Sequence, residues 1–301
     1  MQNESVFNAA QTLMQTTCPP EFESKQYNKP EAASWLDALG KHTKMCSSVL
    51  RNVLLGGNAM SLKLLSKPKD MVFYASETLF TYKMLAGSSQ LEQKNIWEVL
   101  GSSGTAAITL AEMSDAFFFG PVASYTADII GLCQICSQIK PISIFEIGTL
   151  RGYTAYHFAL NSPATSKVYS LDLPHDQTRT TLKTTLVDEW HINESHQDHR
   201  YLFENTPVER KINLLYGDSA TFDFSQFFGT IDLFFIDSAH SYEYVRSDTL
   251  NALKCCHKGS VIAWHDFGRT GVNGVSKCLE EFARQYSIYR IPGGSLAYMV
   301  V

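Results

Sequence analysis

The most informative segment of this chain reads Ile142-Ser-Ile-Phe-Glu-Ile-Gly-Thr-Leu-Arg-Gly-Tyr-Thr-Ala-Tyr-His157. Its first part, Ile142–Ile147, is rich in β-branched and aromatic residues, which predicts a buried strand. Gly148 and Gly152 then interrupt the strand, and helical spacing follows. Such a turn leaves unpaired backbone N–H groups and open space at the carboxyl edge of a sheet. Because glycine has no Cβ, we expect a ligand to approach the backbone here.

The glycine spacing excludes two nucleotide-binding motifs. The dinucleotide fingerprint GxGxxG needs a second glycine where the chain has Leu150, and no Gly-Lys-Ser/Thr of a phosphate loop follows. Glu146 lies just before the turn, so the segment suits a ligand that carries a positive charge. A tight strand-to-helix turn in any α/β domain would have the same pattern, and the segment alone leaves both interpretations open.

Four further apolar runs also deliver a polar residue at the carboxyl end, and they are Lys167–Asp172, Ile212–Asp218, Ile231–Asp237 and Ser260–Asp266. Helical patterns separate several of these runs, as parallel βαβ units require. In such sheets the ligand crevice lies outside the carboxyl ends of the strands. We therefore predict an α/β domain whose terminal acids converge on one site.

The end of the chain distinguishes this sheet from a dinucleotide-binding fold. A helix with an apolar stripe from Val272 to Tyr286 follows the fifth run, and a helix is also expected over residues 122–139. Two short strand patterns, Ser287–Ile291 and Ser295–Val301, then flank the turn Pro292–Gly294. This order predicts a terminal antiparallel hairpin, which a dinucleotide-binding fold does not have.

Composition limits the class of protein and its partners. The chain has 301 residues, 45% of them hydrophobic, which is enough for one large domain and a smaller one. The net charge of −5 argues against nucleic acid as a partner. We expect no signal peptide and no membrane span, since no apolar run approaches the roughly 20 residues a bilayer requires.

The cysteines indicate a reducing compartment. Their number is odd, seven, and most lie in apolar helical contexts, so we expect reduced thiols in a cytoplasmic protein. Cys133 and Cys136 form a CxxC pair, but no second pair has the spacing of a zinc site. Both fall on the apolar stripe of the helix expected at 122–139, so we predict core packing.

We expect two regions. Residues 1–120 have helix-compatible spacing and are interpreted as a helical N-terminal region, and residues 121–301 form the core. The apolar junction Ala116–Pro121 is either a buried hinge or part of a lid over the crevice. The polar interval 173–211 is expected to shape the substrate entrance, and its histidines are expected at the solvated surface; they are His191, His196 and His199.

Residues 121–301 resemble the class I S-adenosylmethionine-dependent methyltransferases, in particular the small-molecule O-methyltransferase branch. The resemblance rests on the order and spacing of Glu146–Gly152, Leu171–Leu173, Gly217–Ser219, Phe235–Glu243 and Trp264–Phe267. It implies a Rossmann-like, seven-stranded, doubly wound α/β sheet whose last strand lies antiparallel to its neighbour. It also implies S-adenosyl-L-methionine as cofactor.

The chemistry of that cofactor agrees with the residues. Glu146 would bind the ammonium group, and the backbone at Gly148, Thr149 and Gly152 would bind the carboxylate. Asp172, with Leu173 beside it, would accept both ribose hydroxyls, because two carboxylate oxygens match a vicinal diol. The remaining predicted contacts are Asp218 and Ser219 at the adenine, and Asp237 near the methyl group.

A second group of residues concerns the proton of an acceptor hydroxyl. In the metal-dependent O-methyltransferases that this chain resembles, Mg²⁺ is held by an acid in the position of Asp237 and by an acidic pair at the end of the next strand. Here the metal set would be Asp237, His265 and Asp266, and His265 stands where a carboxylate is usual. A divalent metal (Mg, Mn or Fe) is therefore expected here. Imidazole suits Mn²⁺, Fe²⁺ or Zn²⁺ better than Mg²⁺. Either the metal is a transition ion with His265 as a ligand, or His265 is not a ligand and orients the substrate. His240 is predicted as general base, with Asp237 as its catalytic partner.

The sequence therefore predicts methyl transfer to a hydroxyl of a small-molecule or carrier-bound acceptor. Two alternatives stay open: metal-dependent C-methylation of an activated acyl group, and a non-catalytic module that binds S-adenosylmethionine. No nucleic-acid or membrane partner is expected, and a homo-oligomer is left open.

Overall fold

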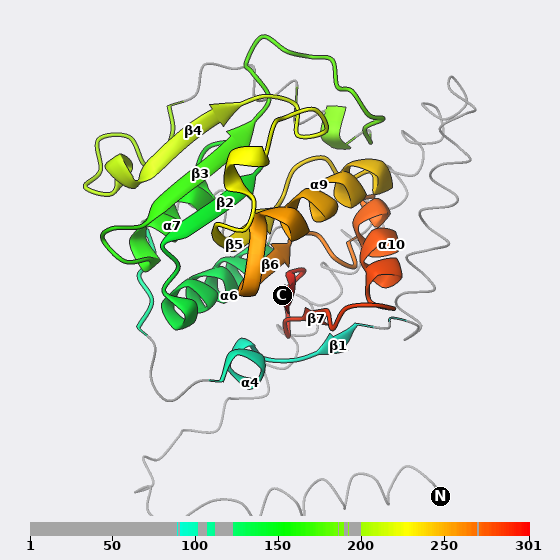
Figure 1. Ribbon diagram of the computed structural model, residues 1–301, viewed down its shortest axis with the longest axis horizontal. Coiled ribbons are helices and arrows are strands. Elements are labelled where there is room, and N and C mark those ends of the chain that lie inside the picture. Colours follow the sequence, from blue (N-terminus) through cyan, green and yellow to red (C-terminus); the bar gives the residue numbers. More distant parts are fainter. Residues whose placement is uncertain are drawn as a thin grey trace, which may run out of the picture. The chain divides into compact units, whose positions relative to one another are not determined.

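The computed structural model describes residues 89, 91–101, 107–111, 123–185, 187–189, 192, 200–269 and 271–301, and these lie in the compact unit Lys69–Val301. They form a mixed eight-stranded sheet with helices on both faces (Figure 1). The strands are β1 (Glu92–Gln93), β2 (Ser143–Ile147), β3 (Lys167–Asp172), β4 (Ile212–Tyr216), β5 (Ile231–Ile236), β6 (Cys256–Trp264), β7 (Tyr289–Arg290) and β8 (Ala297–Val300).

The sheet has the order β1-β7-β8-β6-β5-β2-β3-β4. The strands β2 to β6 pair in parallel, so the five predicted strand ends all point to one edge. β8 lies antiparallel between β6 and β7, as the terminal hairpin predicts. The α/β fold and the antiparallel last strand are thereby confirmed.

The helices are α4 (Ile96–Leu100), α6 (Ala123–Ile139), α7 (Tyr153–Asn161), α9 (Tyr242–Cys255) and α10 (Asn273–Phe282), with 3₁₀ turns η2 (Glu209–Lys211) and η3 (Ser225–Phe227). Ser241 is the N-cap of α9, and its side chain accepts the Tyr244 N–H. None of the helices in the described ranges has the length and apolar character needed to cross a membrane.

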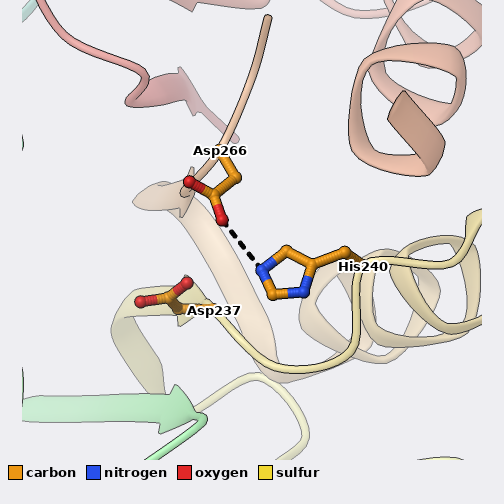
Figure 2. Close-up of side chains that lie close together, drawn as sticks. All are labelled: Asp237, His240 and Asp266. Carbon is orange, nitrogen blue, oxygen red and sulfur yellow. Dashed lines mark ion pairs between the residues drawn. The ribbon is translucent and has the colours of Figure 1, made fainter. Parts of the chain in front are cut away.

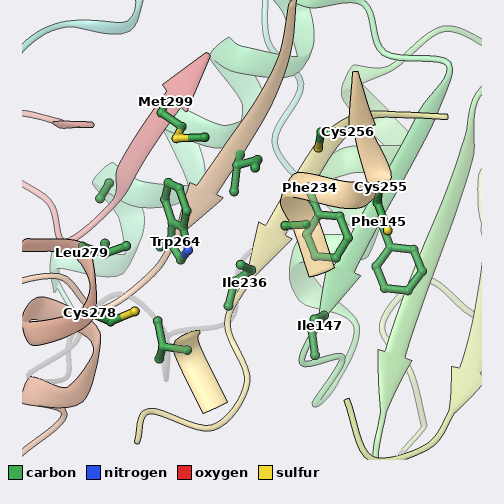
Figure 3. Packing of buried hydrophobic residues seen from close by; sticks show 14 of the residues in the cluster. Phe145, Ile147, Phe234, Ile236, Cys255, Cys256, Trp264, Cys278, Leu279 and Met299 are labelled. Carbon is green, nitrogen blue, oxygen red and sulfur yellow. The ribbon is translucent and has the colours of Figure 1, made fainter. Parts of the chain in front are cut away.

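One apolar cluster lies between the sheet and the helices α9 and α10. Trp264 and Phe234 are fully buried in it, and Figure 3 shows them packed with side chains from both helices. Phe145 stacks on Phe234 with ring centroids 4.9 Å apart. Successive side chains of a strand point to opposite faces of the sheet, so the residues next to Phe145 and Phe234 in sequence face the other side.

The second cluster packs α6 and α7 on the opposite face. Ile144, Leu233 and Phe235 contribute from the strands. Cys133 and Cys136 are buried in this cluster with free thiols, so the prediction of core packing is correct. Helices therefore cover both faces of the sheet, and the edge at which the parallel strands end is not covered by these two clusters.

An eighth strand was not predicted. β1 pairs in parallel with β7 at the edge of the sheet, and α4 packs beside α6. Both come from the stretch expected to be a helical N-terminal region. Residues 1–88 and the junction Ala116–Pro121 lie outside the described residues, so the two-region division and the lid stay predictions.

Gly148 is a point of close backbone approach. Its φ is +102°, and a Cβ there would lie 2.0 Å from the carbonyl oxygen of Asp237. We predicted that a side chain at this position would fill ligand space. Gly148 does line the cleft, but the nearer obstacle is the main chain after β5. The glycine is thus required by strand packing as well as by ligand access.

We predict that Gly148→Ala destabilises the protein strongly, because it combines left-handed backbone strain of about 1–3 kcal/mol with a backbone clash. Gly229→Ala is a matched control, since φ is +67° there and nothing lies within 4 Å of the added Cβ. Urea unfolding should give a clearly larger loss of unfolding free energy for Gly148→Ala. Equal losses would contradict the packing argument.

Candidate functional site

A cleft of about 370 Å³ opens at the carboxyl edge of the sheet. Its volume falls in the range of small-molecule sites. It is lined by Ile147–Arg151, Tyr153, Thr154, Leu171–Leu173, Thr180, Asp188, Ile192, Gly217–Ser219, Asp237–His240, Tyr244, His265, Asp266 and Arg269. The predicted acids of β3, β4, β5 and β6 therefore meet in one cleft.

Asp172, the last residue of β3, organises the turn between β2 and α7. Its Oδ2 accepts the backbone N–H groups of Thr149 at 3.1 Å and Leu150 at 2.8 Å, and its Oδ1 accepts that of Leu173 at 2.8 Å. Burial raises the pKa of this carboxyl, and these three bonds partly offset the rise. The three N–H groups that we expected to bind a ligand carboxylate are thus held within the protein: that of Thr149 by Asp172, that of Gly148 by the Leu171 carbonyl and that of Gly152 by the Thr149 carbonyl.

Glu146 lies beneath the cleft and does not line it. The residue is fully buried, Ser170 Oγ donates to its Oε1 at 2.8 Å, and Thr149 Oγ1 lies 2.6 Å from Ser170 Oγ. Burial raises the pKa of Glu146 well above its ordinary value. Glu146 is therefore joined to the cleft wall only through the hydroxyls of Ser170 and Thr149, and its position does not fit the predicted direct contact with a ligand ammonium.

Asp218 forms the adjacent wall with Tyr244. The Tyr244 hydroxyl lies 2.9 Å from both Asp218 carboxylate oxygens, and the backbone N–H of Thr181 donates to Oδ2 at 2.6 Å. Burial alone would raise the pKa of Asp218, but these bonds and that from Ala220 lower it. Ser219 is buried beside it. Tyr244 lies in the first turn of α9, and the sequence gives no signal of its role.

Two histidines and two aspartates form the second half of the cleft. His265 Nδ1 lies 3.1 Å from Asp237 Oδ1 and 3.1 Å from Asp266 Oδ1. His240 Nε2 lies 2.8 Å from Asp266 Oδ2, and Figure 2 shows the ring of His240 facing that carboxylate. Asp266 has a φ of +64°, a left-handed conformation that aspartate tolerates. Arg269 also donates to Asp266, at 2.6 Å.

A buried carboxylate lies behind each histidine, and neither was predicted. Asp128 of α6 accepts from Ser295 and Leu296, and its Oδ2 lies 3.0 Å from His265 Nε2. Asp188 Oδ1 lies 2.6 Å from His240 Nδ1. Asp128 interrupts an apolar helical stripe, which is a weak signal that could have been used. Asp188 lies in the polar interval 173–211, where an aspartate is unremarkable.

The charge of His240 follows from these contacts. Burial alone would lower the pKa of its imidazole, but hydrogen bonds and charge from Asp188 and Asp266 raise it to about 10. We expected Asp237 to be the catalytic partner of His240, and the acids in contact with the ring are Asp188 and Asp266 instead. His265 likewise has its pKa raised well above the ordinary value, against the opposing effect of burial.

Of the predicted site residues, all of them described, ten line the cleft: Gly148, Thr149, Asp172, Leu173, Asp218, Ser219, Asp237, His240, His265 and Asp266. Glu146 and Gly152 do not. Gly152 is the N-cap of α7, where a Cβ would lie 2.4 Å from Phe203. His191, His196 and His199 lie outside the described residues.

The donor set fits a divalent ion. Asp237, His240 and Asp266 each offer one ligand atom, and these atoms lie within 4.8 Å of one another. Nδ1 of His265 contacts both carboxylates of that group. Mixed imidazole and carboxylate donors suit transition ions better than Mg²⁺. The geometry thus offers His240 as an alternative to the predicted third donor, His265, and ligation by His240 would compete with its predicted use as a base.

We predict a pH dependence of stability from the raised pKa of His240. The imidazolium is stabilised in the folded state, so its contribution is fully present below the ordinary pKa of 6.5 and is lost as pH rises toward 10. In metal-free buffer, urea unfolding should show a steeper decline over this window for the parent than for His240→Asn. Parallel pH profiles would rule out the charged imidazole.

Comparison with known proteins adds one match in sequence. Residues 145–267 match a family described as a methyltransferase domain. No curated protein matches the chain.

Solved structures with a similar chain trace include three bacterial proteins. Cofactor-bound Rv0187 from MTB has 14% identity and a TM-score of 0.43, over 65% of this chain and 84% of that chain. The O-methyltransferase TomG from Streptomyces achromogenes, in complex with SAM, has 15% identity and a TM-score of 0.39, over 64% and 92%. The O-methyltransferase from Bacillus cereus, in complex with SAH, has 16% and 0.41, over 73% and 96%. At these TM-scores, the likenesses assign no substrate and no residue role.

Features of this chain agree with the match in sequence. The matched region runs from within β2 to just past β6, and so covers the acid-terminated strands that line the cleft. β8 lies antiparallel beside β6, which the sequence motifs imply. Residues 145–267 therefore match a methyltransferase domain in sequence, and the parallel strands of that match end at the cleft.

Proposed function

We propose that the protein transfers a methyl group from S-adenosylmethionine to a hydroxyl of a small-molecule or carrier-bound acceptor. One observation carries this proposal: a single cleft is lined both by the turn after β2 and by His240, Asp237 and Asp266. A donor on the first side and a hydroxyl on the second would therefore be neighbours. Alignment of this kind contributes much of the rate of a displacement reaction.

The residues of the first side would bind and orient the donor. Asp172 would accept the ribose hydroxyls while it continues to hold the turn at Thr149 and Leu150. Asp218 and Ser219 would face the adenine. Gly148 leaves the backbone accessible at the methionine end. S-adenosylmethionine supplies the methyl group, and the apolar side chains around it exclude water.

The residues of the second side would prepare the acceptor. In its neutral form, with Nε2 released from Asp266, His240 would take the proton of the hydroxyl at Nε2, with Asp237 beside the reacting atoms. A divalent ion held by Asp237, His265 and Asp266 would lower the pKa of the hydroxyl and, by its charge, that of His240. Arg269 reaches Asp266 with a charged side chain, and it would help to balance the acids of this half.

The rest of the proposal follows from composition and from the residues around the cleft. Thr180, Asp188 and Ile192 line it, which supports a role for the interval 173–211 at the substrate entrance. The buried thiols support a reducing, cytoplasmic location. We further propose that the N-terminal region selects the acceptor, and that neither nucleic acid nor membrane is a partner.

Asp172→Ala should weaken S-adenosylmethionine binding by about 1–3 kcal/mol, because it removes hydrogen bonds from an ionised acceptor to a buried diol. Titration calorimetry measures this change. Asp176→Ala serves as control, because Asp176 is exposed in the same connection and does not line the cleft. An unchanged dissociation constant for Asp172→Ala would refute the assignment.

The proposed function is tested with a panel of hydroxyl acceptors, isotopically labelled donor and mass spectrometry of the products. Parent protein should add one methyl group to oxygen. His240→Ala should lower kcat by about 10²–10⁴-fold and leave cofactor affinity nearly unchanged. His257→Ala is the matched control, because this histidine lies at the opposite end of β6 on Asp232. Methylation of carbon, or full turnover by His240→Ala, would overturn the proposal.

A further inference from the structure

We infer that Asp188, in the connection between β3 and β4, is the positioning residue that holds His240 with Nε2 toward the reaction centre. The inference rests on the proposed role of His240 as general base. Asp188 is 52 positions from His240 in the sequence and lies on none of the strands that end in an acid. A segment outside the sheet would thereby complete the catalytic group.

One carboxylate oxygen of Asp188 contacts His240 twice. Oδ1 accepts the backbone N–H of His240 at 3.0 Å and lies 2.6 Å from its ring Nδ1. The ring is therefore fixed relative to its own backbone. With Nδ1 donating to Asp188, Nε2 is the nitrogen that faces the cleft and Asp266. A base oriented by a carboxylate on its far nitrogen is a recurring arrangement in acid–base catalysis.

The carboxylate of Asp188 is itself held in place. Its Oδ2 accepts the backbone N–H of Thr185 at 2.6 Å, and the N–H of Asp188 donates to Thr185 Oγ1 at 3.2 Å. This reciprocal pair has the pattern of a capping box at the start of a helical turn. Asp188 is only 3% exposed. Rotation of the carboxylate would therefore break contacts on both sides, so the His240 ring is oriented before substrate binds.

The same connection is attached to the cofactor side of the cleft. The N–H of Thr181 donates to Asp218, and the N–H of Leu182 donates to the Tyr244 hydroxyl at 3.3 Å. The connection thus runs from the expected adenine wall to the expected base. Packing of this connection against Asp218, Tyr244 and His240 would form the substrate entrance and orient the His240 ring at the same time.

A capping role alone would explain some of these contacts, and two variants separate the roles. Asp188→Asn keeps the shape of the side chain but leaves one acceptor oxygen for donors on two sides, Thr185 and His240. Whichever way the amide turns, its NH₂ group faces a donor. Thr185→Ala removes the hydroxyl half of the capping box and leaves the contact between Asp188 and His240.

The decisive experiment is a double-mutant cycle on the full chain, with kcat, KM and cofactor affinity measured for each protein. Asp188→Asn should lower kcat by about 10–10²-fold, with KM and cofactor affinity changed by no more than about twofold. In a His240→Ala background it should cause no further loss, because its effect passes through His240. Thr185→Ala should keep kcat near that of the parent.

Several results would overturn the inference. They are additive losses in the cycle, full turnover by Asp188→Asn, and an equal loss in Thr185→Ala. Full turnover by His240→Ala is distinguishable, because it removes the proposed base itself. A readout without turnover is the downfield imidazole N–H resonance of a short bond to a carboxylate. It should be present in the parent, absent in His240→Ala and shifted in Asp188→Asn, and its absence from the parent overturns the inference.

Discussion

Parallel pairing of β2 with β3 and β5 is the constraint on which the site depends. Parallel strands end at the same edge, so this pairing brings Asp172 and Asp237 to the turn at Gly148. The contact is close enough that the N–H of Asp237 donates to the Ile147 carbonyl at 2.9 Å and no Cβ fits at Gly148. The strand order thus fixes the floor of the cleft before any ligand is present.

The acids at this edge would repel one another as carboxylates, and different groups stabilise their charge in the two halves of the cleft. In the half next to the turn after β2, the acids accept backbone N–H groups and the Tyr244 hydroxyl, which stabilise carboxylates without adding charge. In the other half the acids face imidazole rings. The same contacts that raise the pKa of His240 and His265 lower that of Asp266. The imidazole rings with strongly shifted pKa values therefore lie together in the second half.

The core supports the second half directly. Asp128 is fully buried on α6, yet it accepts hydrogen bonds from Ser295 and Leu296 just before β8 and contacts His265 at the cleft. One carboxylate therefore joins a core helix, the terminal hairpin and a site residue. Its buried charge is compensated by these donors, and loss of any of them would leave a polar group unpaired. Stability and site geometry are coupled at this point.

The sequence by itself determined the sheet, its acid-terminated strands and the antiparallel end, because hydrophobic periodicity and turn residues are local properties. It also identified ten of the residues that line the cleft, since each lies at the end of a strand or within four residues after it. Only the tertiary structure decided which contacts those residues make. It buried Glu146 beneath the floor and brought Asp128 and Asp188 behind the two histidines. The two partners are separated by 52 positions in the contact of Asp188 with His240 and by 137 positions in that of Asp128 with His265. Such contacts depend on how separate elements pack, and no local sequence pattern encodes this packing.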